Sequence, residues 1–124
     1  MKKVFLDDYR KPSDVFYLSV DFDYQEDNGW LIIKSYDEFI TYIINNDLPE
    51  LISFDHDLSQ EHYLPEHQTN INYSEIQKTG YHALKWLIDY CEENKLSLPI
   101  CKVHSQNIIG KKNMLELIEI AMKK

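Results

Sequence analysis

The sequence predicts an α/β fold built on a mainly parallel sheet of about four strands. Four short apolar runs, at residues 4–6, 30–34, 51–54 and 100–103, alternate with segments whose apolar residues recur at helical spacing. Strands that alternate with helices form parallel β/α units, because each helix carries the chain back to the starting end of the sheet. A chain of 124 residues fits one such unit, so we predict a single domain over residues 1–124.

The first predicted strand, at residues 4–6, runs into acidic residues and then into Pro12. Because of this proline, no long helix is expected to begin at Arg10. Residues 14–29 mix aromatic and alternating character and end in an Asn28-Gly29 turn signal. This segment is predicted to be an irregular insertion in which short strands can pair.

The second and third strands, at residues 30–34 and 51–54, flank a predicted helix. Ser35 and Glu38 make a capping-box pattern that predicts where this helix begins. The residues expected to share its buried face are Phe39, Ile40, Ile43 and Ile44.

The second half of the chain opens with a polar loop, residues 59–78, which is long enough to act as a flap over a site. Ser74 and Gln77 make another capping pattern, although Gly80 weakens any helix that runs through it. Helical spacing predicts two more core-facing helices, one on each side of the strand at 100–103. Their apolar residues are Leu84, Leu87, Ile88 and Cys91 in the first helix, and Met114, Leu117, Ile118 and Ala121 in the second.

The net charge of −8 argues against a surface that follows the phosphates of duplex nucleic acid, since such surfaces gather Lys and Arg. Cys91 and Cys101 lie in apolar contexts without a CxxC motif, which favours buried thiols in a reduced, cytoplasmic protein. No signal peptide and no run long enough to cross a bilayer are found. We therefore expect a cytoplasmic protein without a membrane partner, and the sequence leaves its oligomeric state open.

Polar residues capable of chemistry follow three of the four predicted strands. In a parallel sheet the carboxyl ends of the strands share one edge, and ligands bind there, near the point where the strand order reverses. One crevice is therefore expected to collect these clusters. Their members are Asp7, Asp8 and Arg10 after the first strand, Asp55, His56 and Asp57 after the third, and His104, Ser105 and Asn107 after the fourth.

Taken singly, each cluster has an ordinary structural explanation. Asp7 and Asp8 can begin a turn or a helix by accepting hydrogen bonds from free backbone N–H groups. The second cluster can be a solvated turn with an ion-paired His56, and the third a hydrogen-bonded strand end. Their joint placement at one sheet edge favours a functional site, whereas a purely structural interaction domain requires the acidic residues to be dispersed.

Carboxylates that lie close together repel one another, so they need a cation or a shared proton. Oxygen-rich clusters suit Mg²⁺, Ca²⁺ or Mn²⁺, and nearby imidazoles widen the choice toward Mn²⁺, iron or Zn²⁺. Such an ion neutralises a phosphate and lowers the pKa of a bound water. Alternatively, Asp55 attacks phosphorus itself, with Ser105 as a donor to a phosphoryl oxygen. His56 or His104 can act as the general acid.

Other polar residues are weaker candidates. Lys111 stands where the last helix begins and can meet an anion there, although lysines in such places are usually only solvated. Three further histidines, His62, His67 and His82, can supply a metal ligand, but solvent exposure is the more ordinary expectation for those in the loop.

Four stretches in order, VFLDDYRKP, ISFDHDLS, TGYHALKWLIDYC and VHSQNIIGKKNM, resemble the cyclic-phosphate-processing receiver-like family. The resemblance covers most of the chain except residues 15–29 and 59–78. It implies the three-layer α/β/α sandwich of receiver domains, which is flavodoxin-like. By this likeness Asp7 and Asp8 match the metal-binding acidic pair, Asp55 matches the aspartate that receivers phosphorylate, and Ser105 matches the hydroxyl residue that contacts the phosphoryl group.

The chain also departs from an ordinary receiver. No fifth strand with the receiver lysine follows Asn107, and a phosphorylation switch does not require His56, Asp57 or His104. These departures favour an enzyme, and the leading hypothesis is a metal-dependent phosphoesterase that processes cyclic phosphates of nucleotides or RNA ends. The alternative is a receiver-like module that senses a phosphorylated ligand without turnover.

The leading hypothesis assigns each cluster a role, with Mg²⁺ or Mn²⁺ as the cofactor. Which metal, which cyclic phosphate and which nucleophile, a bound water or Asp55, stay open. The predicted metal ligands are Asp7, Asp8, Asp55 and Asp57. The predicted catalytic residues are Asp55, His56, His104 and Ser105. The predicted phosphate-binding residues are Arg10, Ser105, Asn107 and Lys111.

Overall fold

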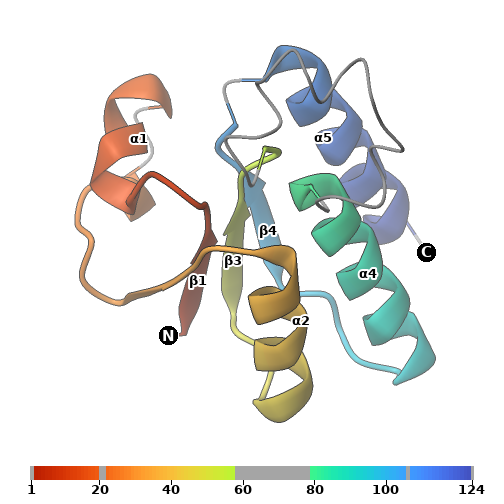
Figure 1. The fold of residues 1–124 in the computed structure, drawn as a ribbon. Coiled ribbons are helices and arrows are strands. Elements are labelled where there is room, and N and C mark those ends of the chain that lie inside the picture. Colours follow the sequence, from red (N-terminus) through yellow and green to blue (C-terminus); the bar gives the residue numbers. More distant parts are fainter. Residues whose placement is uncertain (1, 20–21, 58–78, 106, 124) are drawn as a thin grey trace, which may run out of the picture.

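The computed structural model describes residues 2–19, 22–57, 79–105 and 107–123. Its four strands are β1 (Lys3–Leu6), β2 (Trp30–Ile33), β3 (Leu51–Phe54) and β4 (Ile100–Val103), and they form one sheet in the order β2-β1-β3-β4 (Figure 1). All three strand pairs are parallel. The predicted parallel α/β sheet with four core strands is confirmed.

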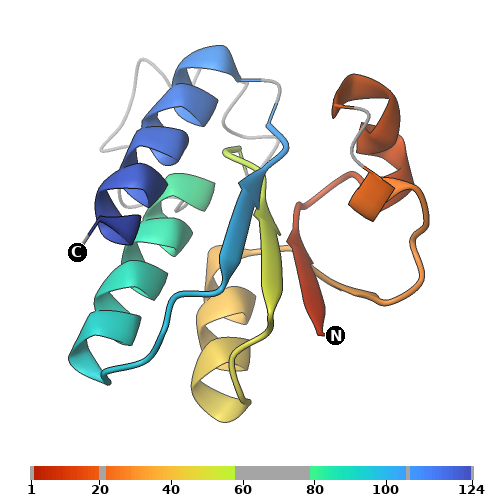
Figure 2. The ribbon, with the colours of Figure 1, turned by 180° about the vertical axis from the view of Figure 1, so that it is seen from behind.

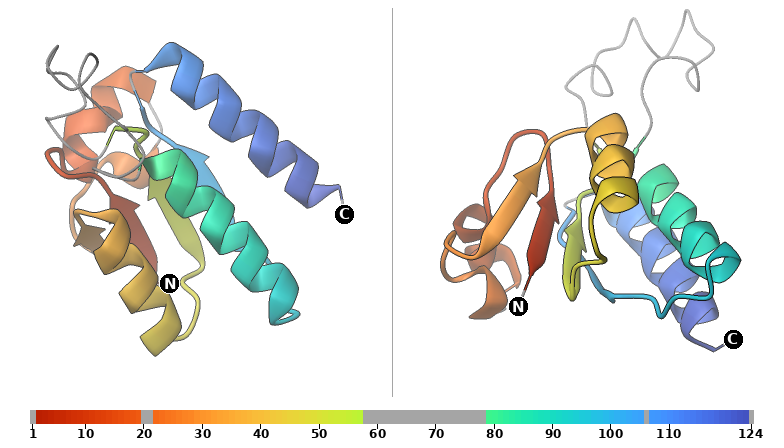
Figure 3. Two further views of the ribbon diagram at one scale, coloured as in Figure 1. Left: turned by 45° about the vertical axis from the view of Figure 1, so that its right-hand side comes forward. Right: turned by 90° about the horizontal axis from the view of Figure 1, so that it is seen from below.

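The strand order reverses between β1 and β3, and this reversal sorts the helices onto two faces. Parallel crossovers are right-handed, so connections that run in opposite directions along the sheet place their helices on opposite faces. The connection from β1 to β2 runs in one direction, and those from β2 to β3 and from β3 to β4 run in the other. Helix α1 (Pro12–Ser19) and the short 3-10 helix η1 (Phe22–Tyr24) follow β1, whereas α2 (Tyr36–Asn45), α4 (Gly80–Glu93) and α5 (Ile108–Met122) follow the other strands. Figures 2 and 3 show the resulting three layers.

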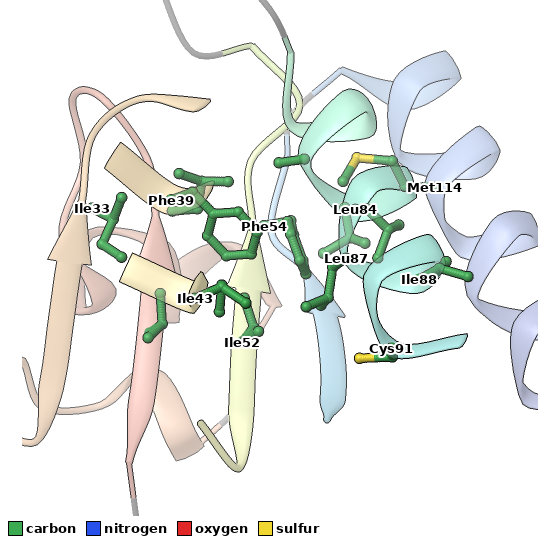
Figure 4. Close-up of a cluster of buried hydrophobic side chains, with 14 residues drawn as sticks. Ile33, Phe39, Ile43, Ile52, Phe54, Leu84, Leu87, Ile88, Cys91 and Met114 are labelled. Carbon is green, nitrogen blue, oxygen red and sulfur yellow. The ribbon is translucent and has the colours of Figure 1, made fainter. Parts of the chain in front are cut away.

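The larger core lies between the sheet and the layer of α2, α4 and α5 (Figure 4). Strand side chains alternate between faces, so every second residue of β1 and β3 points into this core. The sheet contributes Val4, Leu6, Ile33, Ile52, Phe54 and Val103, and the helices contribute Phe39, Ile43, Ala83, Leu84, Leu87, Ile88, Cys91 and Met114. This core fixes the ends of α4 and α5 against the carboxyl edge of the sheet.

A smaller, aromatic core covers the opposite face. Phe5, Tyr24 and Trp30 pack edge-to-face or stacked, with ring centroids 5.7–6.2 Å apart, and Val15 from α1 and Leu51 from β3 complete the buried cluster. The indole Nε1–H of Trp30 donates to the carbonyl oxygen of Asp23, 3.0 Å away. Because η1 is held in this way, Tyr24 has a fixed position beneath the sheet.

The prediction for residues 14–29 was wrong. A helix begins at Pro12, because proline suits the first helical position, where its missing N–H is not needed. Asp27 then caps this helix from a distance, accepting hydrogen bonds from Ser13 N at 2.8 Å and Ser13 Oγ at 3.1 Å. Within the described part of residues 14–29 the secondary structure is α1 and η1, and no strand forms.

The capping pattern at Ser35 is confirmed, since its Oγ accepts a hydrogen bond from Glu38 N. Phe39 and Ile43 are buried as predicted, but Ile44 is 56% exposed, because it lies beyond the edge of the buried stripe. The pattern at Ser74 and Gln77 lies outside the described residues. Within the described residues, Thr79 caps α4, and the imidazole of His82 accepts a hydrogen bond from Thr79 N.

The predictions of which residues face the core in α4 and α5 agree with the structure. All four apolar residues predicted to face the core from α4 are buried, and Met114 of α5 is buried as well. Leu117, Ile118 and Ala121 are partly buried against the same core. Of the residues described, none lies in a helix long and apolar enough to cross a membrane.

Candidate functional site

Asp7, Asp55 and His104 lie side by side at the carboxyl edge of the sheet. The backbone ladder continues one residue beyond the strands and places them there: Asp7 N donates to Ile33 O at 3.0 Å, Asp55 N to Leu6 O at 2.9 Å, and His104 N to Phe54 O at 3.0 Å. Ligand atoms of the three side chains all lie within 4.8 Å of one another, and all three residues are buried. We call this group the buried trio.

Asp7 is held as a carboxylate from both of its oxygens. Its Oδ1 accepts hydrogen bonds from Tyr9 N and Arg10 N, each at 2.8 Å, and its Oδ2 accepts one from His104 Nε2 at 3.0 Å. Burial raises the pKa of Asp7, but the hydrogen bonds from His104 and from the two backbone N–H groups outweigh it and leave the pKa below its usual value. Asp7 is therefore the fixed negative charge of the site.

Asp55 is the carboxyl group whose ionised form the site disfavours. Burial raises its pKa to about 7, and the nearby charge of Asp7 adds to the rise. Arg10 offsets the rise only in part: its Nη2 lies 3.7 Å from Asp55 Oδ1, and its Nε lies 3.6 Å from Asp7 Oδ2. The third nitrogen, Nη1, is buried and makes no hydrogen bond to any described group. A buried Asp55 that is compensated only in part, beside the ionised Asp7, has the electrostatics of a cation site.

His104 is buried at 4% exposure, and both of its ring nitrogens are bonded. Nε2 faces Asp7, and Nδ1 lies 2.6 Å from Ser53 Oγ. Its ring stacks on Phe5, with centroids 4.1 Å apart and planes 8° apart. Burial holds the pKa of His104 below its usual value, which favours the neutral ring. For His104 to act as a general acid, one of its two hydrogen bonds would have to break.

Asp57 lies with a second group of residues. His56 Nδ1 lies 3.0 Å from Asp57 Oδ1, and Asn107 Nδ2 donates to Asp57 Oδ2 at 3.3 Å. Asn107 also caps α5, because its Oδ1 accepts from Gly110 N at 2.9 Å, and its own backbone N–H donates to Ser105 Oγ at 3.0 Å. This group ties the loop after β3 to the start of α5.

Two glycines let the helices approach this edge closely. A Cβ on Gly80 would lie 1.6 Å from the carbonyl oxygen of Asp55, and Gly80 N donates to His56 O at 2.7 Å. A Cβ on Gly110 would lie 2.4 Å from the imidazole of His56. Gly80 is the first residue of α4, so it does not interrupt the helix, and its missing side chain permits the close backbone approach.

The remaining predicted residues that the structure describes belong neither to the buried trio nor to the group around Asp57. Asp8 is half-buried, and the buried trio does not include it. Lys111 is half-buried on α5, near enough for its charge to lower the pKa of His104. His82 serves the cap of α4. His62, His67 and the whole of residues 59–78 lie outside the described residues, so their suggested roles remain predictions.

Asp55 gives the metal-free protein a characteristic pH dependence. Its pKa of about 7 in the folded state exceeds the ordinary value of 3.8, so the folded state binds the proton more tightly. Its stabilising contribution is fully present below pH 4 and is lost as the pH rises through about 7. Asn does not titrate. The free energy of unfolding of Asp55→Asn, relative to that of the wild type, should therefore rise by a few kcal/mol as the pH increases from 4 through about 7. Urea unfolding of both proteins at pH 5 and pH 8, in chelator, tests this. A stability advantage of the variant that is larger at pH 5 than at pH 8 would contradict it.

A family model described as cyclic-phosphate processing receiver domain matches residues 2–120. This range contains every residue of the buried trio and of the group around Asp57. Comparisons with curated proteins and with solved structures found no match.

Proposed function

The chain belongs to the cyclic-phosphate processing receiver domain family, and from this premise we propose that it is a metal-dependent phosphoesterase that opens cyclic phosphates of nucleotides or RNA ends. The observation that carries the proposal is the pair of buried carboxylates, Asp7 and Asp55, whose charges Arg10 compensates only in part. A receiver-like domain associated with cyclic-phosphate processing thus has a site that attracts a cation and, through the cation, a phosphate.

The donor set fits a divalent ion. Two carboxylates and one imidazole, with ligand atoms within 4.8 Å of one another, suit Mn²⁺ and, with water completing the shell, Mg²⁺. Asp7 and Asp55 would hold the ion, and Asp8 and Asp57 are proposed to stand close to it. When bound, the ion supplies positive charge that neutralises the phosphate.

The chain's own residues then divide the remaining tasks. Arg10 has one guanidinium nitrogen without a partner among the described groups, which suits it to a phosphate oxygen. Ser105, Asn107 and Lys111 line the start of α5, where an anion is favoured. His56 is half-buried beside Asp57 and is the better placed proton donor for the leaving oxygen.

The test is a product assay on the metal-stripped protein. We expect ring opening of one class among 2′,3′-cyclic nucleotides, 3′,5′-cyclic nucleotides and short RNAs with a cyclic-phosphate end, and only after Mn²⁺ or Mg²⁺ is added. Mass spectrometry of the products identifies the class, because opening adds one water. Metal binding without turnover on the whole panel would contradict the proposal and favour a sensing module, and a stable phosphoryl group on Asp55 after treatment with a phosphodonor would support that module.

A further inference from the structure

A buried chain of hydrogen bonds connects the site with the opposite face of the sheet. It runs from Asp7 Oδ2 to His104 Nε2 (3.0 Å), from His104 Nδ1 to Ser53 Oγ (2.6 Å), and from Ser53 Oγ to the phenol oxygen of Tyr24 (2.5 Å). All four residues are at most 4% exposed. Ser53 and Tyr24 were not predicted as site residues, yet they are the groups that contact the far side of the His104 ring.

With no cation in the site, the chain has one consistent direction. An ionised Asp7 only accepts, so His104 Nε2 must carry the proton and donate. A neutral imidazole has one N–H, which leaves Nδ1 as an acceptor. Ser53 therefore donates to Nδ1 and accepts from Tyr24. In this state the Nε2 lone pair is not available to anything in the site.

The two hydroxyls also permit the opposite direction. A hydroxyl both donates and accepts, so Ser53 can accept from an N–H at Nδ1 and donate to the Tyr24 oxygen. The ring then keeps one proton, which has left Nε2 and been taken up at Nδ1. Nε2 is left with its lone pair directed toward Asp7 and Asp55. Without the Ser53 hydroxyl, an N–H at Nδ1 would be buried with no acceptor there, which is unfavourable.

We propose that Ser53 and Tyr24 are positioning residues that allow His104 to change tautomer and so present Nε2 to a cation held by Asp7 and Asp55. This inference rests on the cation site of the proposed function, but it does not depend on which substrate is turned over. In metal-binding histidines the N–H at the other ring nitrogen characteristically donates to a neighbouring acceptor, and Ser53 Oγ is the acceptor in place for His104 Nδ1. Phe5 holds the plane of the ring, so the exchange needs movement of protons and hydroxyl rotors only.

Long-range ¹H–¹⁵N correlation spectra of uniformly ¹⁵N-labelled protein report the tautomer directly, and the backbone amide signals of Asp7 and Asp55 report cation binding. The wild type without metal is expected to show the proton of His104 on Nε2. Saturation with Zn²⁺, a diamagnetic probe, should move it to Nδ1 and shift Nε2 to the position of a ligated nitrogen. If the proton stays on Nε2 while the Asp7 and Asp55 signals respond to Zn²⁺, the inference is wrong although the cation site stands. If none of these signals responds, the cation site itself is wrong.

Variants separate positioning from simple packing. Ser53→Ala is expected to keep the proton on Nε2 in Zn²⁺ and to weaken Zn²⁺ binding about 10- to 100-fold. Tyr24→Phe retains the Ser53 hydroxyl and should lose affinity only several-fold. Ser97→Ala removes a hydroxyl from an exposed site and should match the wild type. A Ser53→Ala protein that is less stable but binds Zn²⁺ like the wild type, with the same change of tautomer, would overturn the inference.

Discussion

Asp55→Asn should lower the rate of metal-dependent ring opening by about three orders of magnitude. A metal ion contributes several kcal/mol of charge stabilisation, and each 1.36 kcal/mol is a factor of ten in rate. Asn has almost the same shape as Asp, so the fold should remain, but the amide cannot supply the charge that holds the cation. Asp7→Asn should have a similar effect, because it removes the other charge of the pair.

The measurement is the initial rate of product formation at saturating metal on the substrate class found for the wild type. Asp89→Asn is the matched control, since Asp89 is exposed on α4, away from the sheet edge, and should leave the rate unchanged. If Asp7→Asn and Asp55→Asn both retained the full rate, the assignment of the site would be wrong.

Gly80→Ala should produce the largest loss of stability of any single methyl addition to this fold. The new Cβ would lie 1.6 Å from the carbonyl oxygen of Asp55, and neither backbone can retreat without breaking the 2.7 Å hydrogen bond from Gly80 N to His56 O. Overpacking against backbone of this kind costs about 3 kcal/mol or more. For a domain of this size that corresponds to roughly 10 °C in Tm.

Gly29→Ala is the comparison that isolates the steric effect. Gly29 has a φ of +88°, so alanine is strained there, but the nearest atom to its Cβ is the flexible Lys3 side chain at 3.6 Å. Its cost should be about 1 kcal/mol. The Tm of each variant, measured by thermal unfolding, tests this. Equal losses of Tm at the two positions would mean that the clash with Asp55 O does not determine the cost of Gly80→Ala.

The sheet and its edge could be predicted because hydrophobic periodicity is local. Each of the four strands is a short apolar run, and each run ends where charged or polar residues begin. Once the strands were taken as parallel, the meeting of Asp7, Asp55 and His104 followed from topology. The registry of the strands supports that step, since Leu6 pairs with Phe54 and Phe54 with Val103.

The parts that could not be predicted depend on contacts between distant residues. Helix α1 has local start signals in Pro12 and in Asp14, which accepts from Lys11 N at 3.0 Å, but its contact with Asp27, fourteen positions after Ser13, follows from no local pattern. Ser53 is the one polar residue in the strand LISF, and this is the local signal that marks it. Its partner Tyr24 comes from the segment whose fold was predicted wrongly, so their hydrogen bond could not be anticipated.

The partners of Asp57 have a similar cause. Sequence places Asp57 two residues after Asp55, which suggests one acidic shell, and the charge of Asp57 does raise the pKa of Asp55. Its hydrogen bonds to His56 and Asn107 could not be anticipated, because Asn107 reaches that carboxylate only where it caps α5. The tertiary packing of α5, which no local pattern encodes, decides these contacts.

The measurement that tests the cation site most directly is the thermal unfolding of the wild type and Asp55→Asn at pH 8, each in chelator and in Mn²⁺. In chelator the variant should be the more stable protein, because it lacks a buried charge with a raised pKa. In Mn²⁺ the order should reverse, because only the wild type gains the free energy of binding. If the variant remained more stable in Mn²⁺ by the same margin, Asp7 and Asp55 would not form a cation site.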